Sequence, residues 1–195
     1  MGIRTLHIVV AAALLMLCAC SRQTPSGATD ITGAMPRLAF SMTRANDGAA
    51  VTANDYRGKL VALYFGYTHC PDECPTTLAN LAAMLKALGP RASDVRVLFV
   101  TVDPDRDMLP ILKAYVSTFA PQIDGLRGSD NQIARLARRY RVVYRVTPAW
   151  TGHPYDVVHS NTVYIFDASG RARLAILRTD DTMALTKEIG RLLSG

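Results

Sequence analysis

The sequence contains no long run of residues of one charge, although 22 lysines and arginines against 16 aspartates and glutamates give a formal net charge of +6. No known nucleic-acid-binding motif accompanies this positive charge, so we expect no nucleic acid partner. The densest positive cluster is formed by Arg135, Arg138, Arg139, Arg141 and Arg145, the first three of which share one face of a predicted helix. A solvated helix face is the simplest interpretation. The alternative is a docking surface for an acidic partner or for anionic lipid head groups.

The apolar run at the amino terminus is too short to cross a membrane, which takes about 20 residues. It covers the 13 residues from Ile8 to Cys20 and follows a weakly positive start at Arg4, a pattern typical of a secretory signal. Its ending, Leu17-Cys18-Ala19-Cys20-Ser21, resembles a bacterial lipobox. This predicts a signal peptide over residues 1–19 and a lipid on Cys20. A plain signal or an uncleaved anchor is the alternative, and each interpretation places the working domain outside the cytoplasm. With the lipid anchor, we expect it at a membrane of the bacterial cell envelope, facing the periplasm.

Cysteine is scarce in the chain that would remain after cleavage. Of the four cysteines, Cys18 would leave with the signal and Cys20 would be blocked by lipid, which leaves the pair Cys70 and Cys74. Outside the cytoplasm such a pair is exposed to oxidation, so a dithiol that has to stay reduced needs a thiol reductant protein as a partner. The chain of 195 residues, about half of them apolar, can build the core of one domain without disulfides.

Cys70 and Cys74 stand at the turn between an apolar strand-like run, residues 60–67, and a helix-like segment, residues 75–88. Two thiols in such a turn can bind a soft metal, exchange electrons as a dithiol/disulfide pair or staple the turn. Their C-x-x-x-C spacing is one residue longer than the C-x-x-C of the thioredoxin-like redox motif. A staple that closes so short a loop contributes little stability, which favours the metal and redox interpretations.

The position of Cys74 at the start of a helix favours a reactive thiol. Pro75 suits the first turn of that helix. The free backbone N–H groups and the helix dipole at this end favour an anion, so we expect the pKa of a nearby thiol to be lowered. The thiolate is both the nucleophile of disulfide exchange and the form that binds metals.

The order of the predicted elements indicates a single α/β domain over residues 36–195, tethered by the small, polar residues 20–35. Strands, helices and hairpins follow the order of the thioredoxin fold, a mixed central sheet flanked by helices, with an amino-terminal hairpin extension and an inserted helix. The predicted strands are 37–43, 49–52, 60–67, 95–102, 162–166 and 173–177, and the predicted helices are 75–88, 109–119, 130–139 and 182–193.

A third ligand would decide between a metal site and a redox pair. Outside the signal, His69 adjoins Cys70 and is expected to point away from its thiol, and His153 lies in a predicted turn. His159 lies in a predicted loop before the strand 162–166, and in the thioredoxin fold this loop approaches the active-site turn. Two thiolates and one imidazole suit Cu(I) and tolerate Cu(II), whereas zinc normally takes a fourth ligand.

The acidic loop Asp103-Pro104-Asp105-Arg106-Asp107 follows the second buried strand, at the sheet edge where the two cysteines are expected. Asp103 either orients a ligand by hydrogen bonding across the site or belongs to a loop of helix-capping carboxylates. For Asp105 and Asp107 the capping role is favoured, with Asp107 as the N-cap of the next helix.

These residues together resemble the Sco/SenC family of copper-binding assembly factors for cytochrome c oxidase. The resemblance covers residues 36–193 and rests on the stretches 64–78, 101–107 and 158–170, and Gly125-Leu126-Arg127-Gly128 also fits. It implies a thioredoxin-like fold with Cys70, Cys74 and His159 as copper ligands. It also implies delivery of copper to the dinuclear centre of cytochrome c oxidase subunit II or a related terminal oxidase, or reduction of that centre's cysteines. Met108-Leu109 and Val157 depart from the family pattern, but neither departure removes a ligand.

Two functions are therefore compatible with the sequence. The first is a lipid-anchored copper metallochaperone that holds copper between Cys70, Cys74 and His159. The alternative is a thiol–disulfide oxidoreductase that uses Cys70 and Cys74 as a catalytic redox pair without a stable metal, and the two roles are not exclusive. A thiol peroxidase shares the fold, but no convincing peroxidatic-cysteine motif is present. His159 discriminates between the first two functions, because metal binding needs it and disulfide formation does not.

Overall fold

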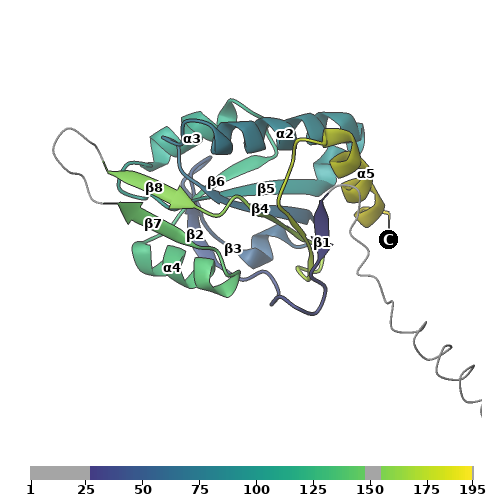
Figure 1. The fold of residues 1–195 in the computed structure, drawn as a ribbon, viewed down its shortest axis with the longest axis horizontal. Coiled ribbons are helices and arrows are strands. Elements are labelled where there is room, and N and C mark those ends of the chain that lie inside the picture. The colour runs from purple at the N-terminus through teal and green to yellow at the C-terminus, as the bar shows by residue number, and fades with distance from the viewer. Residues whose placement is uncertain (1–26, 148–154, 195) are drawn as a thin grey trace, which may run out of the picture.

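The computed structural model describes residues 27–147 and 155–194 of the chain. They form a mixed eight-stranded sheet in the order β1-β10-β9-β4-β5-β6-β2-β3 and a two-stranded sheet of β7 and β8 (Figure 1). The strands are β1 Ala28–Asp30, β2 Ser41–Arg44, β3 Ala50–Thr52, β4 Leu60–Gly66, β5 Val95–Thr101, β6 Ile123–Arg127, β7 Tyr144–Thr147, β8 Asp156–His159, β9 Val163–Phe166 and β10 Ala172–Ile176. The helices are η1 Ala53–Tyr56, α2 Glu73–Leu88, η2 Gly89–Asp94, α3 Leu109–Ser117, α4 Asp130–Arg139 and α5 Thr182–Leu192.

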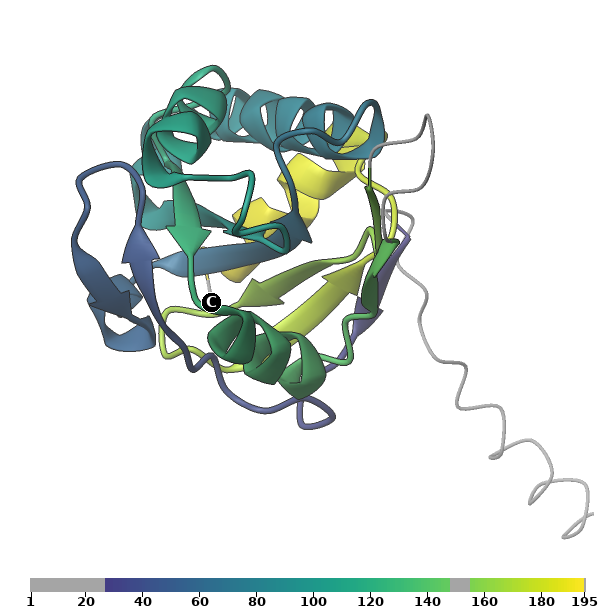
Figure 2. The same ribbon diagram turned by 90° about the vertical axis from the view of Figure 1, so that its left-hand side faces the viewer.

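Helices cover both faces of the eight-stranded sheet. Figures 1 and 2 show α2, α3 and α5 on one face and α4 on the other. Every residue of β4 is buried, and β5 has a single half-buried position, Arg96. This pattern is expected of parallel strands that are covered by helices on both sides. The predicted α/β architecture, a mixed central sheet flanked by helices with the amino-terminal hairpin β2–β3, is confirmed.

One edge of this sheet gathers segments that lie far apart in the sequence. β4 and β5 are parallel, with Gly66 opposite Thr101, so the turn after β4 and the loop after β5 begin side by side. β9 is antiparallel to β4, so the segment that precedes β9 returns to the same edge. That segment includes β8, in which His159 pairs with Tyr144 of β7. Three segments therefore meet at the carboxyl-terminal edge of β4 and β5. They are the turn after β4 that carries Cys70 and Cys74 (the dithiol turn), the acidic loop after β5, and β8 with His159.

Parts of the fold differ from the sequence prediction. Residues 28–30, within the predicted tether 20–35, form β1 and pair with β10, so the predicted domain boundary at residue 36 is too late. The prediction lacks β6 and the β7–β8 pair, and it places His159 in a loop, whereas His159 ends β8. The predicted signal peptide lies outside the described residues. None of the helices in the described part has the length and hydrophobicity of a membrane-spanning segment.

The carboxylate of Asp167 holds the turn of the β9–β10 hairpin together by hydrogen bonds. Its Oδ1 accepts hydrogen bonds from the Ser169 hydroxyl at 2.7 Å and from the Arg171 amide at 3.0 Å, and its Oδ2 accepts one from Arg171 Nε at 3.0 Å. Burial alone would raise the pKa of this carboxyl, but the hydrogen bonds from Ser169 and Arg171 outweigh it and lower the pKa to about 2. Because the pKa is depressed in the folded state, the ionised carboxylate stabilises the fold.

We expect Asp167→Asn to lower the free energy of unfolding by about 2 kcal/mol at neutral pH. The difference in the free energy of unfolding between the variant and the unsubstituted chain should persist at pH values above the unfolded-state pKa of about 3.9. It should disappear as the pH falls through the folded-state pKa. Urea denaturation between low and neutral pH measures this dependence. Asp180→Asn is the control, since Asp180 is exposed and pairs with the exposed Arg178, and it should have little effect. A constant difference at every pH would contradict the assignment.

Candidate metal centre

The turn after β4 and the first turn of α2 place Cys70 and Cys74. Cys74 lies in the first turn of α2 and is completely buried, whereas Cys70 is partly exposed, and both thiols are free. The Cys74 amide lies 3.4 Å from Cys70 Sγ and donates to it. This amide is one of the N–H groups that a helix start leaves without a backbone partner, so the Cys70 sulfur helps to cap α2.

His159 reaches the same place from the end of β8. Its Nε2 lies 3.2 Å from Cys74 Sγ, although the two residues are 85 positions apart in the chain. The three ligand atoms of Cys70, Cys74 and His159 all lie within 4.8 Å of one another. Within the described residues no fourth His, Cys, Asp or Glu joins this group. The structure therefore brings together the three residues that the sequence singled out.

The surroundings of His159 favour a neutral imidazole with Nε2 free to act as a ligand. Burial lowers the pKa of this histidine and outweighs the opposing contact with the Ser160 carbonyl. The Ser160 carbonyl oxygen lies 3.1 Å from Nδ1, so a proton on Nδ1 has an acceptor and the lone pair on Nε2 faces Cys74. The rings of Tyr64 and Tyr67 pack edge-on against the imidazole, with centroids at 6.1 and 5.8 Å.

The expected lowering of the thiol pKa is wrong for Cys74. Burial raises the pKa of the Cys74 thiol well above its ordinary value, and the neighbouring Cys70 sulfur adds to this rise. The helix start does not compensate, because desolvation of the sulfur disfavours the thiolate more strongly. A metal that binds here has to displace the Cys74 proton, so binding is coupled to proton release.

Gly66 at the end of β4 makes room for the buried thiol. A Cβ atom at this position would lie 2.8 Å from Cys74 Sγ and 2.5 Å from Cε2 of Phe99. Both distances are shorter than van der Waals contact. A glycine is therefore required for the Cys74 sulfur to sit against the end of the sheet.

Asn161, two residues after the histidine, was not anticipated as a site residue. Its Oδ1 accepts hydrogen bonds from the Tyr64 hydroxyl at 2.7 Å and from the Thr77 hydroxyl at 3.2 Å. Its amide group donates to the Glu73 carboxylate. The side chain thus ties the segment after His159 to β4 and α2. A lone asparagine before a strand carries no signal from which this role could be read.

The other histidines do not join the group. The side chain of His69 is half exposed, and its Nδ1 lies 3.1 Å from the Thr68 hydroxyl. This agrees with the expectation that His69 points away from the Cys70 thiol. His153 and the predicted lipidation site Cys20 lie outside the described residues.

In the acidic loop, the aspartates at 103 and 107 are buried and Asp105 is exposed. The expected capping role of Asp107 is wrong, because α3 begins after Met108 without a side-chain cap. Its completely buried carboxylate instead accepts hydrogen bonds from Thr68 and Thr101. Asp103 does not contact the cysteines or His159 directly. It binds Arg106 and the Tyr155 hydroxyl, and Tyr155 directly precedes β8.

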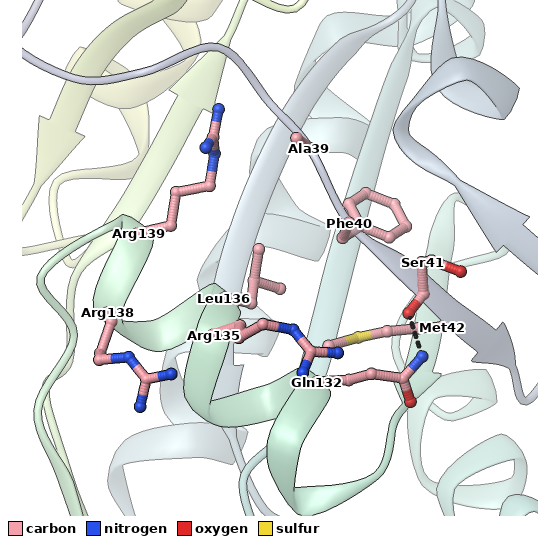
Figure 3. Close-up of a pocket in the computed structure, with 9 residues that line it drawn as sticks. All are labelled: Ala39, Phe40, Ser41, Met42, Gln132, Arg135, Leu136, Arg138 and Arg139. Carbon is pink, nitrogen blue, oxygen red and sulfur yellow. Dashed lines mark hydrogen bonds between the residues drawn. The ribbon is translucent and has the colours of Figure 1, made fainter.

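Within the arginine cluster, Arg145 lies on β7 opposite Val158 and lines a groove together with His159. The arginines of α4, Arg135, Arg138 and Arg139, line a different groove, between α4 and the segment that leads into β2 (Figure 3). The Arg139 guanidinium donates to the Arg37 carbonyl, and Gln132 donates to the Ser41 carbonyl at 2.7 Å. Arg135, Arg138 and Arg139 are all exposed on α4, which agrees with the predicted solvent-exposed helix face. Among the described residues, neither Arg135 nor Arg138 forms a salt bridge.

Comparison with known proteins identifies relatives of this chain. The family model described as SCO1/SenC matches residues 32–194. The mitochondrial protein SCO2 homolog of Bos taurus is 42% identical over 135 residues, which are 65% of this chain and 51% of that protein. The chain thus spans about half the length of the curated relative.

Solved structures match the chain over most of their own length. The crystal structure of Arabidopsis thaliana ScoI with copper bound has a TM-score of 0.74 and 35% identity, and the match covers 81% of this chain and 98% of that one. The structure of Bradyrhizobium japonicum ScoI with copper bound has a TM-score of 0.69 and 36% identity, and the match covers 78% and 98%.

The difference in burial predicts that the two thiols react at different rates. In a chain with Cys18 and Cys20 replaced by serine, the Cys74→Ser variant retains the accessible Cys70, and the Cys70→Ser variant retains the buried Cys74. We expect a thiol reagent to modify the first variant at least about tenfold faster than the second, since reactivity follows exposure and thiolate fraction. Absorbance of the released chromophore measures both rates. In denaturant the rates should become similar, and equal rates in the folded chains would contradict the structure.

Proposed function

The chain belongs to the SCO1/SenC family, and from this membership and the geometry of its site we propose that it is a copper-binding assembly factor for cytochrome c oxidase. The observation that carries the proposal is that the ligand atoms of Cys70, Cys74 and His159 lie within 4.8 Å of one another. Copper would be held by the two sulfur atoms and by Nε2 of the histidine.

The chemistry of these three ligands fits copper better than other common metals. Two thiolates and one imidazole are soft donors, which Cu(I) prefers and Cu(II) accepts. Zinc would require a fourth ligand, and none of the described residues supplies one. Two solved structures that this chain resembles, from Arabidopsis thaliana and Bradyrhizobium japonicum, are described as having copper bound.

The unequal burial of the ligands suits a protein that passes its metal on. Cys74 is completely buried, while Cys70 and His159 are half-buried at the rim of the site. A ligand of a docked partner can therefore approach from the side of Cys70 and replace the protein's own ligands one at a time. We propose that the recipient is the copper centre of cytochrome c oxidase subunit II or of a related terminal oxidase.

The same two thiols favour a second candidate function, thiol–disulfide exchange. The sulfur atoms are adjacent, free and linked through the hydrogen bond from the Cys74 amide to Cys70 Sγ. Oxidation of the pair would remove two protons and two electrons and form one disulfide, which cannot bind copper. Either function therefore needs a thiol reductant protein that keeps the pair open. Disulfide formation does not require His159.

We expect His159→Ala to weaken Cu(I) binding more than about 100-fold, because losing a ligand costs more than losing one of its outer hydrogen-bond partners. Formation of the Cys70–Cys74 disulfide should be nearly unchanged. Anaerobic competition with a Cu(I) chelator measures the affinity, in a chain with Cys18 and Cys20 replaced by serine. His69→Ala is the matched control and should bind like the unsubstituted chain, since His69 lies next to Cys70 but outside the donor group.

The outcomes of this titration separate the two functions. Loss of binding in His159→Ala but not in His69→Ala supports the copper site, and Cys70→Ser should abolish both copper binding and disulfide formation. Tight binding by His159→Ala would show that the assigned ligands are wrong. If the unsubstituted chain did not compete with the chelator but still cycled between dithiol and disulfide, the oxidoreductase would be the better description.

We propose further that a lipid on Cys20 holds the domain at the membrane, on the periplasmic side of a bacterial cell envelope. The proposal is supported by the apolar run that ends at the lipobox-like residues 17–21. β1 begins eight residues after Cys20, so the chain between lipid and fold would be short.

We expect Cys20→Ser to move the chain from the membrane fraction to the soluble fraction, or to leave the signal uncleaved, because the lipid cannot be attached. Cys18→Ser is the control and should stay in the membrane fraction, since Cys18 would leave with the signal. Fractionation of cells, together with the mass of the mature chain, measures both effects. A Cys20→Ser chain that kept the mass and the membrane association of the unsubstituted one would contradict the lipidation.

A further inference from the structure

The loop between β5 and α3 contacts both halves of the proposed copper site. One half is the dithiol turn after β4, and the other is the segment that leads into β8 and ends with His159. Residues 101–107, the last residue of β5 and the loop that follows it, include the buried carboxylates of Asp103 and Asp107. Among the described residues, neither carboxylate forms a hydrogen bond with a cysteine or His159 or joins the donor group, so the proposed ligand set leaves both without a role.

Asp107 holds the dithiol turn. Its Oδ2 accepts from the Thr68 amide at 3.0 Å, and its Oδ1 accepts from the Thr68 hydroxyl at 2.6 Å. Thr68 stands two residues before Cys70, at the start of the turn. The carboxylate is 0% exposed, and a completely buried carboxylate is tolerated when hydrogen bonds satisfy it. The Asp107 side chain therefore ties the turn to the loop after β5, in addition to the backbone hydrogen bond from Val102 to Gly66.

Asp103 and Arg106 hold the histidine segment. The Tyr155 hydroxyl donates to Asp103 Oδ1 at 2.7 Å, and Arg106 Nε donates to Asp103 Oδ2. The Arg106 guanidinium also stacks 3.9 Å from the centroid of the Tyr155 ring and donates to the Tyr155 carbonyl at 3.3 Å. Tyr155 directly precedes β8, so these contacts fix the segment from which His159 projects.

The loop is itself held in one shape. The Thr101 hydroxyl donates to Asp107 Oδ2 at 2.6 Å and accepts from the Asp103 amide at 3.0 Å. The Asp107 amide donates to the Asp103 carbonyl at 3.0 Å. Asp103 and Asp107, which hold the two halves, are thus joined to each other through Thr101 and through the hydrogen bond between their backbones. The loop is therefore a common support to which each half is tied by its own carboxylate.

A direct contact between the halves runs alongside the loop. The Tyr67 hydroxyl lies 3.3 Å from Asp156 Oδ1, to which it donates, and the Tyr67 ring packs edge-on against His159. The Arg106 guanidinium lies 5.7 Å from the centroid of the Tyr67 ring. Arg106 therefore contacts aromatic rings from both halves, with its charge balanced by Asp103.

We propose that residues 101–107 form a brace that sets the separation between the two thiols and the His159 imidazole, with Asp107 positioning the dithiol turn and Asp103, Arg106 and Tyr155 positioning the histidine. The expected effect of the brace on copper binding rests on the proposed copper site. The expected effect of the brace on the distances between the three side chains does not. These are positioning residues, which act on copper through Cys70, Cys74 and His159.

The test uses Tyr155→Phe, which removes one hydroxyl and keeps the ring, in the chain with Cys18 and Cys20 replaced by serine. We expect Cu(I) affinity to fall about tenfold, the size of effect typical when an outer partner of a ligand is lost. The thiolate-to-Cu(II) absorption band should shift, and the equilibrium of Cys70 and Cys74 with glutathione should not change. Tyr56→Phe is the matched control, because it removes a buried tyrosine–aspartate hydrogen bond of 3.0 Å to Asp124.

A second substitution tests the dithiol half. Asp107→Ala leaves the Thr68 amide without its acceptor, so we expect weaker copper binding together with a shifted glutathione equilibrium. Asp107→Asn should restore most of both properties, since the amide retains one acceptor oxygen and can donate to the Thr68 hydroxyl. Asp124→Ala is the control for removing a buried carboxylate. Unfolding curves of all variants separate a local effect from a general loss of stability.

The metal-free chain provides a readout that does not depend on copper. The ring signals of His159 in nuclear magnetic resonance spectra should move in Tyr155→Phe and stay in place in Tyr56→Phe. If the unsubstituted chain did not bind copper, the proposed function would be wrong, and these signals and the glutathione equilibrium would still test the brace. If Tyr155→Phe matched Tyr56→Phe in copper affinity, absorption band and ring signals, the brace would be wrong.

Discussion

The contact between Cys74 Sγ and His159 Nε2, 3.2 Å long, is the constraint on which the rest of the site depends. It joins the first turn of α2 to the end of β8, and it forms because β4, β5 and β9 bring both segments to one edge of the sheet. Gly66 has to lack a side chain for the sulfur to fit, since a Cβ atom there would lie 2.8 Å from it. The buried strands thus act as a frame that holds one thiol and one imidazole in place, while Cys70 lies nearer the surface.

Burial of the site has opposite effects on its two kinds of ligand. It lowers the pKa of His159 and so keeps the imidazole neutral and ready to bind, whereas it raises the pKa of the Cys74 thiol and keeps this group protonated. The start of α2 favours an anion, but desolvation of a completely buried sulfur is the larger effect. Metal binding and disulfide formation both remove the Cys74 proton. Neither leaves an uncompensated thiolate, because a bound metal ion balances the charge and a disulfide sulfur carries none. The metal-free Cys74 thiol therefore stays protonated, and its burial makes metal binding dependent on proton release.

The residues that the structure brings together could be singled out from the sequence, the cysteines by a local pattern and His159 by its place in the expected fold, and the residues that position them could not. The C-x-x-x-C spacing between a strand and a helix marks Cys70 and Cys74, and His159 was identified from its expected place opposite them, although it ends a strand and not a loop. β6 was missed because Asp124 and Gly125 weaken its pattern; Gly125 is needed there since a Cβ atom would lie 2.7 Å from Leu112. The sequence suggests that Asp107 caps a helix, whereas it binds Thr101 and Thr68, and the pairing with Thr68, 39 residues away, depends on the register of β4 and β5.

A site assembled from three distant segments has to control the distance between them without closing around the metal. A structural zinc site achieves this with four ligands that enclose the ion, and it holds the ion permanently. Here three ligands are offered and one of them, Cys70, lies toward the surface, so rigidity has to come from outside the ligand set. Asn161 fixes the segment after His159 to β4 and α2, and Asp103 and Asp107 fix the segments before His159 and Cys70 to the end of β5. Because these hydrogen bonds do not involve the ligand atoms, the proposed transfer of copper to a partner would leave them in place, and the site would keep its shape through the exchange.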